Sequence, residues 1–273
     1  MKIINPDVSV IKNKKLFVFD MDGTIYLGSI PFDFAIRFID NLRKSGRRVL
    51  FFTNNASHTD EFYIKKLKRL GFSAEKEEIM TSGDVTLEFL KRHRAGKSVY
   101  LVGTDELVED FRQNGINILD GSEERADIVI TSFDTSLTYE KLDNACRFIR
   151  GGAEYLSTHP DKNCPTETGF IPDSGAISAF VTASTGEVPT YFGKPYRETV
   201  EMICEATATD PADMCIFGDR LMTDIALGKN FGVTSALVLT GETKLSDLDR
   251  APENETPDFV FDSLAELDEI MFG

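Results

Sequence analysis

Residues 15–24 read KLFVFDMDGT, a short apolar run that ends in two aspartates, a glycine and a threonine. The run favours a strand, and apolar residues at helical spacing over residues 31–44 predict a helix after it. Residues 47–53 (RRVLFFT) begin a second unit of this kind, with a helix over residues 60–70. Two consecutive βα units predict parallel strands, and open sheets of this kind bind ligands at the carboxyl ends of their strands. We therefore expect the chemistry where these strands end.

The rest of the chain continues the α/β pattern in two series. Between residues 83 and 186, the strand-like runs SVYLVG and DIVITS alternate with helical patterns, and a loop rich in Pro and Asp precedes a last helix. Strand-like character then resumes at YFGKP, and MCIFGD at 214–219 predicts a buried strand with an acidic end. The pattern predicts one domain formed by residues 1–82 and 187–273, interrupted by an inserted α/β domain over residues 83–186.

Composition narrows the class of protein. The 273 residues include 45 Asp and Glu against 30 Lys and Arg, and the formal net charge of −15 disfavours a nucleic-acid partner. Purely apolar stretches such as residues 49–52 are far shorter than the roughly 20 residues that cross a bilayer. The first 15 residues lack the apolar segment of a secretory signal. We therefore expect a cytoplasmic protein without nucleic-acid or membrane partners.

Four strand or loop ends each carry a group that a phosphoryl-transfer site needs. Each is ordinary by itself, because Asp-Gly and Thr-Asn-Asn are common turns and a Lys before Pro is usually solvated. Together they supply carboxylates for a metal ion, a hydroxyl for a phosphoryl oxygen and a cation. The residues are Asp20 and Asp22, Thr53 and Asn54, Lys194, and Asp219 with Asp224.

These segments, DMDGT, TNN, Lys before Pro and GDRLMTD, resemble the four motifs of the haloacid dehalogenase-like superfamily and stand in the same order. The resemblance covers nearly the whole chain. The insertion, together with FTNNAS, TGFIPDSGAI and FGKP, resembles the class IIA members, which are NagD-like and 4-nitrophenylphosphatase-like phosphatases. This resemblance implies a Rossmann-like parallel-sheet core with an inserted α/β cap domain of the C2 type. One departure is the loop THPD, in which His159 replaces the asparagine of many relatives.

The resemblance implies a role for each core residue. Asp20 would be the nucleophile that forms an aspartyl-phosphate, and an ionised carboxylate needs no base for this. Asp22 would act as general acid and then as general base, which requires a pKa raised by a neighbouring carboxylate or by partial burial. Thr53 and the backbone N–H of Asn54 would bind a phosphoryl oxygen. Lys194 would neutralise the phosphoryl group and the nucleophile together.

The resemblance also implies a magnesium site. Mg²⁺ prefers six oxygen ligands and usually keeps several waters. Its ligands would be Asp20, Asp219 and the backbone carbonyl of Asp22. Asp224 is either an outer or direct ligand, or an aspartate that complements the dipole at a helix N-terminus.

Specificity is expected to lie in the inserted domain. Candidate substrate contacts there are His159, Asp161 and residues 166–175, and Asn55, just past Thr53 in the other domain, is a further candidate. The alternative is a structural turn, because prolines at 160, 165 and 172 favour turns.

We therefore predict a Mg²⁺-dependent phosphatase that hydrolyses small phosphomonoesters, such as sugar, nucleotide or related metabolite phosphates, with p-nitrophenyl phosphate as an artificial substrate. One alternative is a phosphotransferase or mutase that passes the phosphoryl group to a second acceptor. Another is a non-catalytic sensor of a phosphorylated metabolite, although no motif residue is lost. Dimers formed through the cap in similar proteins suggest a homodimer.

Overall fold

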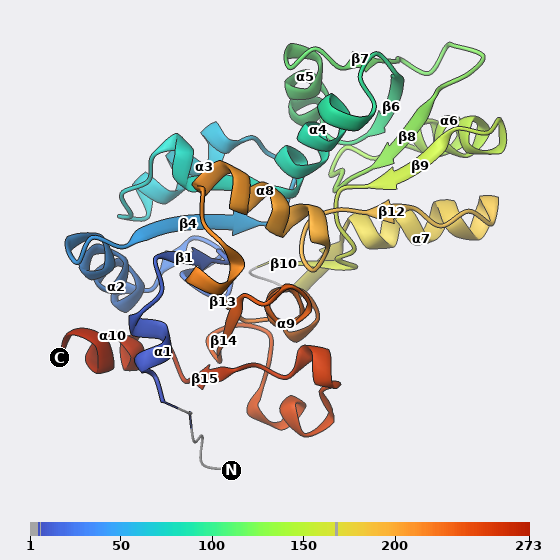
Figure 1. Ribbon diagram of the computed structural model, residues 1–273. Helices are drawn as coiled ribbons and strands as arrows, with labels where there is room; N and C mark the ends of the chain where they lie inside the picture. The colour runs from blue at the N-terminus through green and yellow to red at the C-terminus, as the bar shows by residue number, and fades with distance from the viewer. Residues whose placement is uncertain (1–4, 6, 167–168) are drawn as a thin grey trace. The chain divides into compact units, whose positions relative to one another are not determined.

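The computed structural model describes residue 5 and residues 7–166 and 169–273 (Figure 1). The chain divides into two compact units. Unit 1 comprises Met1–Thr53, Ile64–Met80 and Lys194–Gly273, and unit 2 comprises Asn54–Tyr63 and Thr81–Gly193. The chain therefore passes from one unit to the other four times.

Unit 1 is built on a six-stranded sheet in the order β15-β14-β13-β1-β4-β5 (Figure 1). The strands are β1 (Leu16–Phe19), β4 (Arg48–Thr53), β5 (Ile79–Thr81), β13 (Met214–Gly218), β14 (Thr234–Val238) and β15 (Phe259–Phe261). β1 pairs in parallel with β4 and β13, and β14 pairs in parallel with β13 and β15. All residues of β1 and β13 are buried, because a parallel sheet of this kind is covered on both faces.

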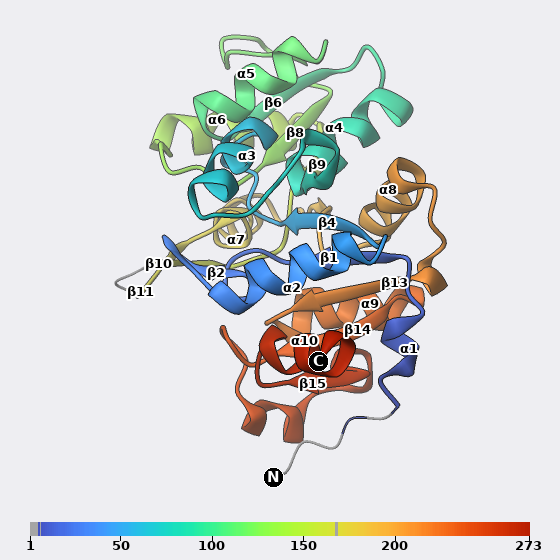
Figure 2. The ribbon, with the colours of Figure 1, turned by 90° about the vertical axis from the view of Figure 1, so that its left-hand side faces the viewer.

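Helices and short turns complete unit 1. Figure 2 views its sheet from the side of α2 (Asp33–Lys44) and α10 (Leu264–Phe272), which pack against each other. α8 (Arg197–Thr207) and α9 (Ala226–Phe231) form a second packed pair. The remaining elements of this part are α1 (Ser9–Lys12), the hairpin β2 (Tyr26–Leu27) and β3 (Ile30–Pro31), a π-helix (Leu221–Ile225), and 3₁₀ turns at Lys76–Glu78, Pro211–Asp213, Leu245–Arg250 and Glu253–Glu255.

Unit 2 is built on a parallel five-stranded sheet in the order β12-β9-β8-β6-β7. The strands are β6 (Ser98–Val102), β7 (Asn117–Ile118), β8 (Ile128–Thr131), β9 (Glu154–Ser157) and β12 (Thr190–Tyr191). Its helices are α4 (Ser82–His93), α5 (Asp105–Gln113), α6 (Tyr139–Arg150) and α7 (Ser174–Thr185), and α3 (Asp60–Arg69) starts in this unit. Apolar side chains of α6 and α7 form a core with those of β6 and β8. An antiparallel hairpin of β10 (Asn163–Thr166) and β11 (Gly169–Pro172) precedes α7.

The predicted α/β class with a parallel sheet in each part is confirmed. α6 (Tyr139–Arg150) lies in the segment for which the sequence predicts helices between the strands. Within the described part of the chain, no helix combines the length and the apolar character that a membrane crossing requires.

The observed units differ from the predicted domain limits at three places, one of which is residues 81 and 82, predicted in the first domain but part of unit 2. Residues 54–63 group with unit 2, because the carboxylate of Glu106 pairs with His58 and accepts the N–H of Thr59. The return to unit 1 was predicted after residue 186. However, β12 pairs with β9, so the chain leaves unit 2 only after Gly193.

Candidate active site

The turn after β1 carries two carboxylates, Asp20 and Asp22, at the end of a central strand. The N–H of Asp20 donates to the carbonyl of Phe217 (2.8 Å), which ties the turn to β13. Gly23 has φ +87°, and a Cβ there would lie 2.5 Å from Oδ2 of Asp219. Glycine is therefore needed both for the left-handed backbone and for the close approach of Asp219.

Lys194 is buried among carboxylates of unit 1. Its side chain is 2% exposed, and its Nζ lies 2.5 Å from Oδ1 of Asp20 and 2.7 Å from Oδ1 of Asp224. It also donates to the carbonyl of Phe52 at 3.4 Å. Burial opposes the charged form, but the two carboxylates outweigh it, so the pKa of Lys194 lies above its ordinary value. The side chain is therefore a fixed positive charge, unlike the solvated Lys that its local sequence alone favours.

Three carboxylates gather around this cation. One oxygen from each of Asp20, Asp219 and Asp224 lies within 4.8 Å of the others. Burial raises the pKa of Asp20 to about 7 in spite of Lys194, and burial with the charges of the other two carboxylates raises the pKa of Asp219 well above its usual range. With all three carboxylates ionised, negative charge would exceed the single positive charge of Lys194, so an added cation is needed to keep them ionised.

The cluster fits a divalent cation. Oδ2 of Asp219 accepts the N–H of Glu242 (2.6 Å), whereas its buried Oδ1 has no hydrogen-bond partner among the described residues. An unpartnered buried carboxylate oxygen beside two further carboxylates is the donor set that a hard cation prefers. The acidic cluster can therefore hold a metal ion. The prediction for Asp22 concerns its backbone carbonyl and stays a prediction.

Asp224 lies inside this cluster and is fully buried. It belongs to the π-helix Leu221–Ile225, and its Oδ2 accepts the N–H of Arg220 at 3.2 Å while Oδ1 faces Lys194. Of the two interpretations that the sequence left open, the contacts favour a side chain that belongs to the site.

Asp22 is half-buried, and its environment suits an acid and base. Burial raises the pKa of its carboxyl, while the charge of Lys66 and the N–H of Gly28 act in the opposite direction. The predicted raised pKa is present, and partial burial is its main cause. Thr53 is buried and is the last residue of β4. Asp20, Thr53 and Asp219 therefore all lie at the carboxyl ends of neighbouring strands of the sheet.

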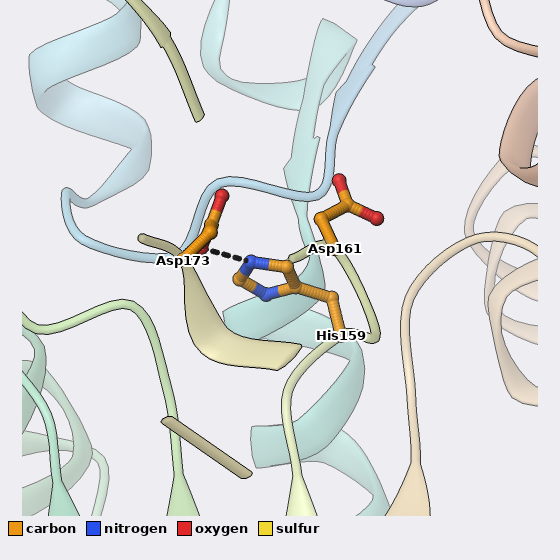
Figure 3. Close-up of side chains that lie close together, drawn as sticks. All are labelled: His159, Asp161 and Asp173. Atoms are coloured by element: carbon orange, nitrogen blue, oxygen red, sulfur yellow. Dashed lines mark hydrogen bonds and ion pairs between the residues drawn. The ribbon is translucent and has the colours of Figure 1, made fainter. Parts of the chain in front are cut away.

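The other predicted substrate contacts lie in unit 2. Asn54 is buried and Asn55 is half-buried. The side-chain amide of Asn54 donates to Oδ1 of Asp161 at 3.2 Å. Figure 3 shows His159 directed toward Asp173, with Nε2 2.8 Å from Oδ1 of that carboxylate. His159 has no exposed surface. Its role as a substrate contact stays a prediction, as does that of residues 166–175, of which 167 and 168 lie outside the described residues.

Sequence reasoning missed several groups that hold these side chains. The N–H of Glu242, in the turn after β14, orients Asp219, and Gly241 leaves the space that this requires. In unit 2, Ser82 contacts the loop that contains His159. The sequence indicates only that a helix begins at Ser82, because Thr81 and Asp84 form a capping pair around it. It does not indicate the contact with His159.

Comparison with known proteins identifies the family. A model described as haloacid dehalogenase-like hydrolase matches residues 17–117, and a HAD-hydrolase-like model matches residues 191–267. The acid sugar phosphatase of Staphylococcus haemolyticus is 35% identical over 249 residues, which cover 91% of this chain and 94% of that protein. The chain belongs to the haloacid dehalogenase-like hydrolases.

Solved structures place it in one branch of that family. A 4-nitrophenylphosphatase from Thermotoga maritima has a TM-score of 0.90 and 41% identity, with 96% of this chain and 99% of that chain covered. A glycerol phosphate phosphatase from Mycobacterium tuberculosis, solved in complex with magnesium, has a TM-score of 0.87 and 29% identity, with 98% of this chain and 78% of that chain covered. The predictions of superfamily, branch and activity are confirmed, and the protein is a phosphatase that hydrolyses phosphomonoesters.

Proposed function

We propose that unit 1 hydrolyses small phosphomonoesters, such as sugar, nucleotide and glycerol phosphates, with Mg²⁺ as its cofactor and Asp20 as its nucleophile. The observation that carries this proposal is the Lys194 ammonium held between Asp20 and Asp224, beside an oxygen of Asp219 that has no partner among the residues the structure describes. A phosphomonoester brings about two negative charges near neutral pH, by analogy with phosphoserine. The site therefore needs both a fixed cation and a metal ion.

In the first half of the reaction, a carboxylate oxygen of Asp20 attacks phosphorus and the bond from phosphorus to the ester oxygen breaks. Asp22 donates its proton to that leaving oxygen, and its raised pKa supports a population that is protonated beforehand. Lys194 stays protonated throughout, because two carboxylates favour its charged form, and it offsets the charge on the transferred group.

In the second half, the Asp22 carboxylate takes a proton from water, the water oxygen attacks phosphorus, and the bond from phosphorus to Asp20 breaks. Free phosphate leaves and Asp22 is protonated again, which closes the cycle. Thr53, buried at the end of β4, would donate its hydroxyl hydrogen to a phosphoryl oxygen in both halves.

Asp20, Asp219 and Asp224 would hold the metal ion, with the backbone carbonyl of Asp22 as a further ligand. When bound, Mg²⁺ supplies positive charge that keeps these carboxylates ionised and offsets the negative charge of the phosphoryl group. The magnesium complex of the related glycerol phosphate phosphatase supports the choice of metal.

The test is phosphate release from p-nitrophenyl phosphate and from a panel of sugar, nucleotide and glycerol phosphates, with Mg²⁺ or with EDTA. We expect release that requires Mg²⁺, that yields one phosphate per ester cleaved, and that Asp20→Asn abolishes. Phosphate yields well below the alcohol released would instead indicate transfer to a second acceptor. Undiminished release in EDTA would contradict the role of the metal.

A further inference from the structure

Unit 2 buries a polar cluster around the loop Thr158–Asp161 (Figure 3). Besides Asp173 on its Nε2 side, His159 has two hydroxyl groups near Nδ1. Oγ1 of Thr158 lies 2.9 Å and Oγ of Ser82 lies 3.3 Å from that nitrogen. The ring is therefore contacted on both nitrogens by groups of its own unit.

The hydrogen bonds of these two hydroxyl groups indicate whether Nδ1 of His159 carries a hydrogen. Ser82 donates its one hydroxyl hydrogen to the carbonyl of Asn54 (2.5 Å), and Thr158 donates its own to Oγ of Ser132 (3.0 Å). Each hydroxyl has only one hydrogen to donate. Toward Nδ1, both oxygens must therefore accept, so Nδ1 of His159 carries a hydrogen.

The other ring nitrogen, Nε2, faces Asp173. Oδ1 of Asp173 accepts the N–H of Ser174 at 2.6 Å. Nε2 of His159 lies 2.8 Å from the same oxygen, and with a hydrogen on Nε2 this contact is a hydrogen bond that His159 donates to Asp173. Both ring nitrogens of His159 therefore take part in hydrogen bonds within unit 2.

This cluster holds Asn54 at three points. Ser82 donates to its backbone carbonyl, and Asp161 accepts from its side-chain amide. Gly193 packs against it so closely that a Cβ on the glycine would lie 2.7 Å from Oδ1 of Asn54 and 3.0 Å from the carbonyl oxygen of Thr158. Asn54 and Gly193 are therefore fixed together against the His159 loop.

These two residues are the direct chain neighbours of Thr53 and Lys194. The Cα atoms of neighbouring residues stay about 3.8 Å apart, so a large displacement of Asn54 or of Gly193 also moves Thr53 or Lys194. The His159 loop therefore contacts both chain segments that lead directly into the proposed phosphoryl site.

We propose that His159 is a positioning residue for phosphoryl binding. Its Nδ1–H fixes the Ser82 hydroxyl that holds Asn54, and the hydrogen bond to Asp173 fixes the ring. The inference rests on the proposed roles of Thr53 and Lys194. It assigns His159 an effect on the phosphoryl group itself, independent of the alcohol part of the substrate.

The test compares two substitutions that each keep one side of the ring. His159→Asn places an amide N–H near the position of Nδ1, and His159→Gln places one near the position of Nε2. The probe is inorganic phosphate as a competitive inhibitor of p-nitrophenyl phosphate hydrolysis in the Mg²⁺-loaded full chain. Its inhibition constant does not depend on the fraction of folded enzyme, so a merely structural defect leaves it unchanged. His93→Gln, at an exposed histidine of α4, is the matched control.

We expect His159→Gln to raise the inhibition constant for phosphate by about tenfold, the size of one lost hydrogen bond. His159→Asn should stay within about twofold of the native value, and His93→Gln should not change it. If His159→Gln does not fold, Ser82→Ala removes the same hydrogen bond to Asn54 and should raise the constant similarly.

The inference is overturned if His159→Gln, or Ser82→Ala in its place, leaves phosphate inhibition unchanged, or if His159→Asn is impaired as much as His159→Gln. A change in KM that differs between ester substrates, with phosphate inhibition unaltered, would instead make His159 a contact of the leaving group. Failure of the proposed function is separate, because it would appear as turnover in Asp20→Asn whatever the His159 variants do.

Discussion

Each unit buries a cluster of ionisable side chains, and the two clusters differ in how completely the protein itself satisfies them. In unit 1, three carboxylates face the single ammonium of Lys194, and one oxygen of Asp219 has no partner among the described residues. In unit 2, His159 pairs with Asp173, hydroxyl groups contact its other ring nitrogen, and Asp161 accepts from the side-chain amide of Asn54. A buried cluster with an unpartnered carboxylate oxygen can bind a cation, whereas one whose groups all have protein partners holds the backbone in place.

The strongest test of this difference is Asp20→Asn in unit 1. We expect turnover to fall by roughly 10³-fold or more, because an amide is a poor nucleophile toward phosphorus. The circular dichroism spectrum should not change, since the amide fills the same space. Asp143→Asn, at an exposed position of α6, is the control and should keep native activity. Near-native turnover in Asp20→Asn would remove the nucleophile from the proposed mechanism.

Lys194→Met should reduce both activity and stability. Loss of the ammonium leaves Asp20 and Asp224 facing each other without a cation, and breaking a buried ion pair costs about 3–5 kcal/mol. Urea denaturation in EDTA measures this loss, which added Mg²⁺ should partly reverse. Lys68→Met, on the exposed surface of α3, should change stability little. An unchanged free energy of unfolding would mean that the carboxylates do not depend on Lys194 for their charge balance.

Mg²⁺ should stabilise unit 1 through the carboxylate cluster. A ligand at a hundred times its Kd stabilises the folded state by about 2.7 kcal/mol, which amounts to a rise of several degrees in Tm. We expect this rise in the native chain and its loss in Asp219→Asn, measured by calorimetry with and without Mg²⁺. Asp173→Asn, in the cluster of unit 2, should keep the rise. Equal rises in native protein and Asp219→Asn would place the metal elsewhere.

The smallest expected effect concerns Asp84, a carboxyl of unit 2 whose oxygen accepts both the N–H and the hydroxyl hydrogen of Thr81. Burial raises its pKa to about 6, in spite of these hydrogen bonds. A folded-state pKa above the ordinary 3.8 means that this carboxyl contributes stability at low pH and that the contribution is lost as pH rises through 6. Asp84→Asn keeps an acceptor for Thr81 and removes the charge.

We therefore expect Asp84→Asn to gain stability relative to the native chain by about 1–2 kcal/mol between pH 4.5 and pH 8. Urea denaturation of both proteins at the two pH values measures this difference, in which the other titrating groups cancel. A difference that is constant with pH would show that Asp84 does not titrate differently in the folded state.

The core of unit 1 and its acidic residues were predictable because each signal is local. An apolar run followed by DMDGT marks a buried strand with carboxylates at its end, and the same holds for MCIFGD at 214–219. Parallel pairing then brings Asp20, Thr53 and Asp219 to one edge of the sheet. Their roles in catalysis remain predictions that the variants above address.

What could not be predicted depends on contacts between distant segments. Neither the burial of Lys194 between two carboxylates nor the π-helix that places Asp224 there has a local signal. Gly186 ends α7, but the chain stays in unit 2 beyond it because β12 pairs with β9. His159 was predicted as a substrate contact from its place in the loop. Its contact with Ser82, a residue 77 positions earlier, has no local signal in the sequence.

The passage of residues 54–63 through unit 2 has a consequence for exchanging specificity between relatives. A transplant of residues 81–193 alone would separate Glu106 and Thr104 from His58, Thr59 and Ser57, which they contact in the native chain. A chimera that also carries residues 54–63 keeps these contacts within the donor sequence. The transferable module of this phosphatase is therefore discontinuous, and its shorter piece begins with the residue that follows Thr53.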